Sequence, residues 1–198
     1  FSSIKPGAPY CQSGMVNHDT KKYVNLLKYL RQELGSDKLL TVATVSSATK
    51  IKSEEDPTVG GYVGAWKDIA KYVDYINIMA YDMHGAFDTT TASQAPWDID
   101  AQHDPFHGKP GGVTIKSSIH AYIDSGVPVG KLVWGMPAYG RSSIISSEGA
   151  TGGLYQASSG APKGEFDATG VYTYKCLTQG DCHGGGTKPA LTLHTKGT

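Results

Sequence analysis

Polar side chains follow one of the short apolar runs in the sequence. The run 73–81 (VDYINIMAY) leads directly into Asp82, and in an extended chain Asn77, Met79 and Tyr81 lie on one face. A tyrosine hydroxyl beside a carboxylate can hold an amide or a hydroxyl group of a ligand. The same residues also suit a packed strand whose final aspartate caps the next loop. The pattern therefore leaves a ligand site and a core strand open.

A second apolar run is followed by a similar set of residues. The run 131–136 (KLVWGM) precedes Tyr139 and Arg141. The arginine fork presents several donors in a fixed plane and can bind a carboxylate or a polar ligand. A surface salt bridge is an equally good interpretation of Arg141.

Other polar clusters in the sequence match no catalytic or metal-binding motif. The acidic triplet 54–56 is typical of a solvated turn. The loop 97–107 holds Asp and His at a spacing that matches no metal-ligand motif, so we expect no metal, and Trp97 is better placed to stack on a sugar at a groove rim. Phosphate-binding glycine loops and the motifs of zinc proteases and serine hydrolases do not occur, and no cofactor is expected.

Charge and composition narrow the classes of partner. The 198 residues carry 18 Lys plus Arg and 18 Asp plus Glu, so we expect neither a nucleic-acid surface nor a polybasic membrane patch. No stretch approaches about 18 uninterrupted apolar residues, so no membrane span is predicted. The 25 glycines and 12 tyrosines suit a protein that binds uncharged polar ligands such as sugars.

The elements that must position these residues alternate in type. Apolar spacing predicts a loop over 1–18, then a helix that Asn17 or Asp19 caps and Gly35 ends, and further helices over 59–72 and 113–125. It predicts strands over 39–45, 73–81 and 131–136. Strands separated by single helices run parallel, so the three strands should be adjacent in a parallel α/β sheet, doubly wound or part of a barrel. The strand 39–45 is nearly continuously apolar and should be covered on both faces. Residues 1–140 form this portion, and residues 141–198, rich in Gly, Ser and Thr, form a smaller module.

Cysteine usage leaves two alternatives open. The chain has three cysteines, so at least one lacks a partner within it. Cys176 and Cys182 flank turn residues and form either a local disulfide or a buried thiol pair. A disulfide would imply an oxidising, secreted setting.

Two motifs together carry a family resemblance. YVDYINIMAYD, with GAFD shortly after it, followed further along by KLVWGMPAYGRS, resembles the family-18 glycoside hydrolases, the chitinase family. The resemblance implies a (β/α)8 TIM barrel with a small α+β insertion module after strand seven. The three predicted strands would be strands five to seven, and residues 141–198 an incomplete part of the module.

The resemblance also implies roles for individual residues. The family mechanism is retaining and substrate-assisted: a glutamic acid protonates the glycosidic oxygen, and the N-acetyl oxygen of the substrate attacks the anomeric carbon. Tyr81 and Asp82 would position the acetamido group of an N-acetylglucosamine unit in chitin or its oligomers. The substrate-binding residues would be Met79, Phe87, Tyr139 and Arg141, with Trp97 at the rim.

The departure from the family pattern is large. The signature Asp-x-x-Asp-x-Asp-x-Glu, which supplies the acid, does not occur in the 198 residues. Phe1 resembles the aromatic residue that follows this acid, so we expect the chain to start just beyond it, as the second half of a secreted chitinase barrel. On its own the chain should be inactive. The alternatives are a sugar-binding lectin or inhibitor, and an inactive fragment whose barrel is completed by association between copies.

Overall fold

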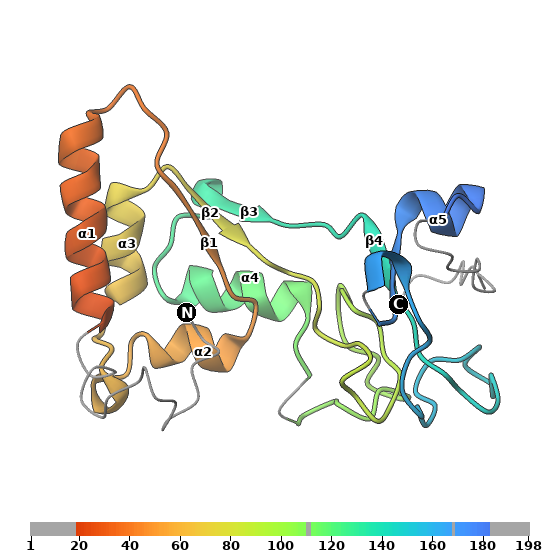
Figure 1. Cartoon of the computed structure of the whole chain (residues 1–198). Helices are drawn as coiled ribbons and strands as arrows, with labels where there is room; N and C mark the ends of the chain where they lie inside the picture. The colour runs from red at the N-terminus through yellow and green to blue at the C-terminus, as the bar shows by residue number, and fades with distance from the viewer. Residues whose placement is uncertain (1–18, 110–111, 168, 183–198) are drawn as a thin grey trace, which may run out of the picture. The chain divides into compact units, whose positions relative to one another are not determined.

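The computed structural model describes residues 19–109, 112–167 and 169–182 (Figure 1). The predicted loop 1–18, with Phe1 and Cys11, lies outside the described residues. The chain divides into two compact units: one runs to Ala80 and resumes over Lys116–Gly135, and the other comprises Tyr81–Ile115 and the residues from Met136 onward. None of the described helices is long and apolar enough to cross a membrane.

The first unit is a three-stranded parallel sheet with its helices. Strands β1 (Thr41–Thr44), β2 (Tyr75–Ile78) and β3 (Leu132–Trp134) lie in the order β1-β2-β3, and both pairs are parallel. This confirms the predicted α/β sheet of adjacent parallel strands. The helices are α1 (Asp19–Leu34), α2 (Ala48–Ser53), α3 (Ala65–Tyr72) and α4 (Ile115–Asp124), and α1 and α3 lie side by side (Figure 1). Single 3-10 turns cover Pro57–Val59 and Val129–Lys131.

Every strand is shorter than predicted, and the end of β2 matters most. After Ile78 the chain turns, and the Ala80 amide donates to the Ile78 carbonyl at 2.8 Å. The predicted alternation of Asn77, Met79 and Tyr81 on one strand face is therefore wrong, because only Asn77 lies within β2. The helix predicted over 59–72 begins only at Ala65, since Gly60 and Gly64 adopt the left-handed region that glycine tolerates.

The described helices cover one face of the sheet. Val42, Ile76 and Ile78 are buried on that face, where α3 and α4 contribute Trp66, Ile69 and Tyr122 to the core. The opposite face carries exposed side chains, among them Thr41, Ala43, Tyr75 and Val133. The expectation that β1 is covered on both faces is thus wrong for the described residues, and the exposed face has no helix layer of its own.

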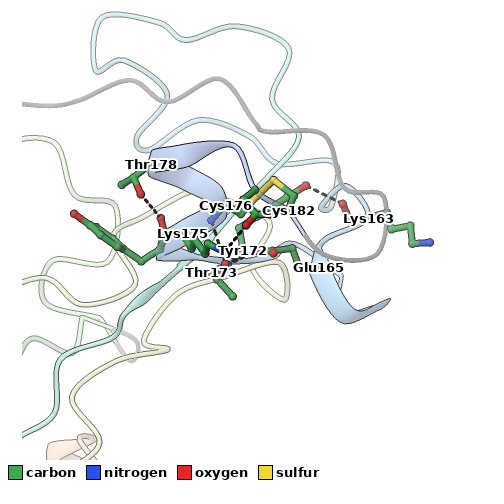
Figure 2. Close-up of a disulfide and its surroundings, with 10 residues drawn as sticks. Lys163, Glu165, Tyr172, Thr173, Lys175, Cys176, Thr178 and Cys182 are labelled. Atoms are coloured by element: carbon green, nitrogen blue, oxygen red, sulfur yellow. Dashed lines mark hydrogen bonds and ion pairs between the residues drawn. A yellow bond between two sulfur atoms is a disulfide. The ribbon is translucent and has the colours of Figure 1, made fainter.

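The second unit is built on two antiparallel strands. Strand β4 (Tyr139–Arg141) pairs with β5 (Val171–Thr173), which leads directly into α5 (Tyr174–Gln179). A disulfide joins Cys176 to Cys182, which confirms the first of the two cysteine alternatives (Figure 2). The buried carboxylate of Glu165 accepts from the backbone amide of Thr173 at 2.5 Å and from its hydroxyl at 2.9 Å. These contacts fix the start of α5 and keep β5 in place against β4.

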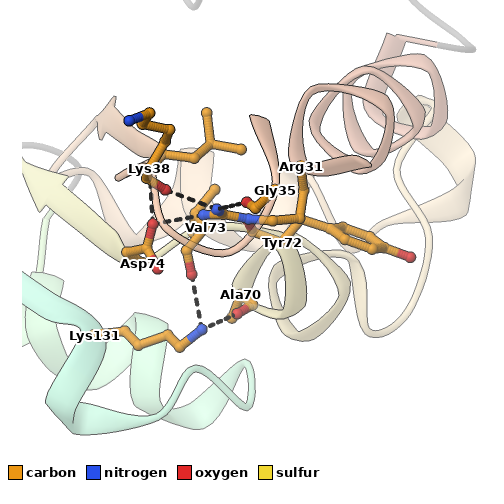
Figure 3. Close-up of polar contacts among 9 residues, drawn as sticks. Arg31, Gly35, Lys38, Ala70, Tyr72, Val73, Asp74 and Lys131 are labelled. Atoms are coloured by element: carbon orange, nitrogen blue, oxygen red, sulfur yellow. Dashed lines mark hydrogen bonds and ion pairs between the residues drawn. The ribbon is translucent and has the colours of Figure 1, made fainter. Parts of the chain in front are cut away.

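Two cationic side chains, Arg31 and Lys131, tie the C-terminal ends of α1 and α3 to the residues that lead into the strands (Figure 3). Arg31 donates to the Asp74 carboxylate at 2.5 Å, and its remaining donors reach backbone carbonyls of Tyr72, Gly35 and Lys38. Lys131 donates to the carbonyls of Ala70 and Val73 at 2.6 and 2.7 Å, which satisfies the free C-terminal end of α3. These bonds join α1 and α3 to the residues immediately before β2 and β3.

Candidate functional site

A carboxylate with two converging donors lies at the start of the second unit. One oxygen of Asp82, Oδ1, accepts from the Tyr139 hydroxyl at 2.5 Å and from Arg141 Nε at 2.6 Å. Tyr139 and Arg141 lie on the same face of β4, because side chains two residues apart in a strand point the same way. Asp82 itself has a φ of 57°, in the left-handed region that aspartate tolerates better than most residues. The sequence predicted each of these residues, and the structure brings them together.

The electrostatics of the cluster keep Asp82 charged. The hydrogen bond from Arg141 and, to a smaller extent, that from Tyr139 lower the pKa of Asp82, against the opposing effect of partial burial. Burial and the neighbouring carboxylate raise the pKa of Tyr139 to about 12. At neutral pH the cluster therefore holds an anionic carboxylate, a neutral hydroxyl donor and a guanidinium cation.

Aromatic rings surround this ion pair. The Tyr81 and Tyr139 rings meet edge to face with centroids 6.3 Å apart. The Arg141 guanidinium lies 5.9 Å from the centroid of the Phe87 ring and 5.8 Å from that of Tyr139. Cation–π contacts of this kind hold the guanidinium in a fixed plane.

Three groups of the cluster remain open to a ligand. Within the described part of the chain, neither the second oxygen of Asp82 nor the Tyr81 hydroxyl has a hydrogen-bond partner. The Phe87 ring is 63% exposed. A free acceptor, a free hydroxyl and an exposed ring face together suit a polar, uncharged ligand with an apolar face, such as a sugar.

Residues that were not predicted from the sequence support this cluster. The Asp88 carboxylate accepts from the Gly85 amide at 3.0 Å and lies 3.2 Å from Nδ1 of His84, which is nearly fully buried. The His84 ring packs on Phe106 with centroids 4.3 Å apart. Gly85 leaves room for Arg141, since a Cβ at Gly85 would lie 2.7 Å from Arg141 Cδ. The Gly and Asp spacing of HGAFD is a turn signal that could have indicated this support.

A further supporting residue comes from the next loop. The Gln94 side chain donates to the backbone carbonyl of Tyr139 at 2.6 Å, and its own backbone carbonyl accepts from the Met83 amide at 2.9 Å. No local sequence pattern indicates this residue.

The remaining predicted residues lie elsewhere. Met79 belongs to the first unit and is 39% exposed, and Trp97 is 53% exposed in a loop of the second unit. Trp97 takes no part in the bonds and ring contacts that build the Asp82 cluster. The acidic triplet 54–56 is not simply solvated, because Glu54 is half-buried and accepts from the Thr20 hydroxyl at 2.6 Å. Across the described residues no three His, Cys, Asp or Glu side chains gather closely enough to hold a metal ion.

Comparison with known proteins identifies relatives of one kind. The model of the family "Glycosyl hydrolases family 18" matches residues 4–192. Chitinase A1 of Niallia circulans is 31% identical in an alignment of 159 residues that covers 76% of this chain and 21% of that protein. Probable chitinase 2 of Drosophila melanogaster is 32% identical over 124 residues, 63% of this chain and 22% of that protein.

Solved structures give the same result. The crystal structure of Ostrinia furnacalis Group IV chitinase in complex with allosamidin has a TM-score of 0.65 and 30% identity, covering 86% of this chain and 43% of that chain. A human pseudo-chitinase with retained chitooligosaccharide binding has a TM-score of 0.62 at 21% identity, which shows a shared fold only. These neighbours place the chain in a TIM-barrel-type fold, and the chain spans less than half the length of each relative named here.

Proposed function

The chain belongs to glycosyl hydrolase family 18, and we propose that it is the strand-five-to-seven portion of a chitinase barrel that hydrolyses β-1,4-linked N-acetylglucosamine polymers. In this proposal β1, β2 and β3 are those three strands, residues 1–140 belong to the barrel, and residues 141–198 are an incomplete insertion module. The parallel order β1-β2-β3 and the single helix-covered face support it. A barrel has helices only outside its sheet, so an exposed second face is what a part of a barrel presents.

The observation that carries the proposal is that both donors of the cluster bond to the same carboxylate oxygen of Asp82. Tyr139 and Arg141 occupy Oδ1, so the carboxylate is fixed and ionised while Oδ2 stays available. An N-acetyl group needs an acceptor for its N–H and a donor for its carbonyl oxygen. Asp82 Oδ2 supplies the acceptor, and the Tyr81 hydroxyl supplies the donor.

The proposed mechanism follows from this arrangement. The acetamido group held by Tyr81 and Asp82 turns its carbonyl oxygen towards the anomeric carbon and attacks as the glycosidic bond breaks. The Asp82 charge stabilises the positive charge that develops on the sugar and acetamido atoms. Phe87 and Trp97 contribute apolar surface for sugar rings, and Arg141 and Tyr139 hold the carboxylate. The proton for the leaving oxygen comes from an acid that the 198 residues do not contain.

A second candidate function is favoured by that same missing acid. A chain with a sugar subsite and no acid motif could bind chitin oligomers as a lectin or inhibitor, or could be an inactive fragment. Completion of the barrel by a second copy belongs to this alternative. In either case the Cys176–Cys182 disulfide supports a secreted protein, because such bonds persist in oxidising compartments.

The test separates these functions by supplying the rest of the barrel. The 198-residue chain alone should release no chromophore from a chitobioside, because general acid catalysis typically contributes about 10²–10⁴-fold. When the chain is fused to the amino-terminal half of a family-18 relative, turnover should appear. In that fusion Tyr81→Phe should slow the reaction about ten- to a hundred-fold, the cost of a lost transition-state hydrogen bond, and Asp82→Asn should slow it more.

Tyr29→Phe is the matched control, because Tyr29 is an exposed tyrosine of α1. Turnover by the isolated chain that a substitution within it abolishes would contradict the missing-acid argument. Wild-type rates for both site variants in an active fusion would show that the motif serves packing. Oligomer binding by an inactive fusion would favour the lectin.

A further inference from the structure

The Gln94 side chain holds two segments that meet at the candidate site. Its Nε2 donates to the Tyr139 carbonyl at 2.6 Å, and its backbone carbonyl accepts from the amide of Met83, the residue after Asp82. The Tyr139 hydroxyl in turn donates to Asp82. Gln94 therefore bonds both to the backbone of Tyr139 and to the backbone next to Asp82.

The position of Tyr139 in its strand explains why this bond is needed. The Tyr174 amide donates to the Ala138 carbonyl, and the Ser142 amide donates to the Gly170 carbonyl. In an antiparallel pair, bonded and non-bonded positions alternate, so the peptide groups of Tyr139 point away from β5. The Tyr139 carbonyl thus depends on a donor from outside the β4–β5 ladder, and Gln94 provides it.

The other end of the Gln94 amide shows that the side chain serves this one bond. Its Oε1 is buried and has no hydrogen-bond partner among the described residues. Rotating the amide would bring Oε1 against the Tyr139 carbonyl oxygen, so the orientation is set by Tyr139. Buried polar groups are nearly always paired, and here the amide keeps the orientation that gives the Tyr139 carbonyl its donor.

We propose that Gln94 is a positioning residue, which holds the Tyr139 backbone so that the tyrosine hydroxyl stays on Asp82. The inference rests on the proposed function only in treating Asp82 as the residue that binds sugar. The consequence for Asp82 itself is independent of any substrate. If Tyr139 were displaced, Asp82 would lose the tyrosine hydrogen bond and keep the one from Arg141.

The experiment measures the Asp82 carboxyl titration in the full chain by carbon-13 NMR, with Asp82→Asn to assign the signal. Gln94→Met keeps the length of the side chain and removes its donor. We expect the pKa of Asp82 to rise by about 0.5 unit or more, a roughly threefold gain in proton affinity, since hydrogen bonds and nearby charges each move a carboxyl pKa by such amounts. The urea midpoint should fall as well, because the Tyr139 carbonyl loses its donor, so the Asp82 titration is the measurement that tests positioning.

Gln156→Met is the matched control. Gln156 lies in the same unit, and its Nε2 donates to the Leu154 carbonyl at 3.0 Å without contacting the cluster. It should lower the urea midpoint and leave the Asp82 titration unchanged. An unchanged Asp82 pKa in Gln94→Met, or an equal rise in Gln156→Met, would overturn the proposal.

If Gln94→Met does not fold, a measurement on the wild-type chain tests whether the bond between Gln94 and Tyr139 persists. The carboxamide protons of Gln94 should exchange with solvent more slowly than those of Gln102, an exposed residue. Equal exchange rates would show that the bond to Tyr139 does not persist. None of these measurements uses a sugar, so a failure of the proposed function in the fusion assay would leave their outcome intact.

Discussion

Replacing Arg141 by methionine tests how the Asp82 charge is held. The substitution keeps most of the apolar length of the side chain and removes the guanidinium, which lies 2.6 Å from Asp82 Oδ1. A hydrogen bond to a charged group contributes about 1.5–3 kcal/mol, and an exposed ion pair contributes at most about 1 kcal/mol. The two side chains are 22% and 35% exposed, so solvent screens the pair in part. We expect Arg141→Met to lower the free energy of unfolding by about 1 kcal/mol at neutral pH.

The pH dependence gives the stronger test. The fold lowers the pKa of Asp82, chiefly through Arg141, so this carboxylate stabilises the folded chain above its unfolded pKa of about 3.9. The contribution is lost as pH falls through the lower, folded pKa. The stability difference between wild type and Arg141→Met should therefore be largest at neutral pH and shrink in acid, down to the part that comes from packing on Phe87 and Tyr139.

The assay is urea unfolding at several pH values, repeated in an Asp82→Asn background. With the carboxylate gone, Arg141→Met should show only the packing part at every pH, and the double-mutant cycle gives the coupling between the two side chains. An equal loss at neutral and acidic pH, or zero coupling at neutral pH, would refute the assignment of Arg141 as the group that keeps Asp82 ionised.

Two further predictions concern the first unit. Arg31→Met should lower the free energy of unfolding by about 2 kcal/mol in urea, because it removes bonds to three carbonyls and the Asp74 carboxylate, whereas Lys28→Met on the exposed side of α1 should have little effect. Tyr122→Phe should cost about 1–2 kcal/mol, because the buried hydroxyl bonds to the Val45 carbonyl at 2.7 Å and to the Thr44 hydroxyl at 2.8 Å. An unchanged urea midpoint in either variant would show that water replaces those bonds without loss.

The sequence was sufficient for the alternation of α1, α3 and α4 with the three parallel strands, but it indicated neither α2 nor the ends of the elements. Apolar runs such as 39–45 and 73–81 predict strands because continuous β-branched residues suit a parallel sheet. The end of β2 depends on a turn at Ile78 and Ala80, where the residues remain apolar, so their pattern carries no stop signal. The late start of α3 depends on the backbone conformations of Gly60 and Gly64, which a glycine permits without requiring.

At the candidate site, too, some residues could be predicted from the sequence and others could not. Asp82, Tyr139 and Arg141 could be predicted because polar residues after apolar strands gather at one edge of a parallel sheet. Gln94 could not, because its bond depends on which edge of β4 is left without a partner. That is a property of the folded β4–β5 pair, and no spacing around residue 94 encodes it.

The charge state of the cluster limits its role in the proposed mechanism, because no group in it is suited to protonate the leaving oxygen. Asp82 is ionised at neutral pH, and Arg141 carries a permanent positive charge. Tyr139, with a pKa raised to about 12, keeps its proton and directs it at Asp82. None of the three can donate a proton to a leaving oxygen, and nearly fully buried His84 is turned towards Asp88 and Phe106. In the proposed mechanism the cluster would therefore orient the acetamido group and stabilise positive charge, and the proton would come from a group outside it.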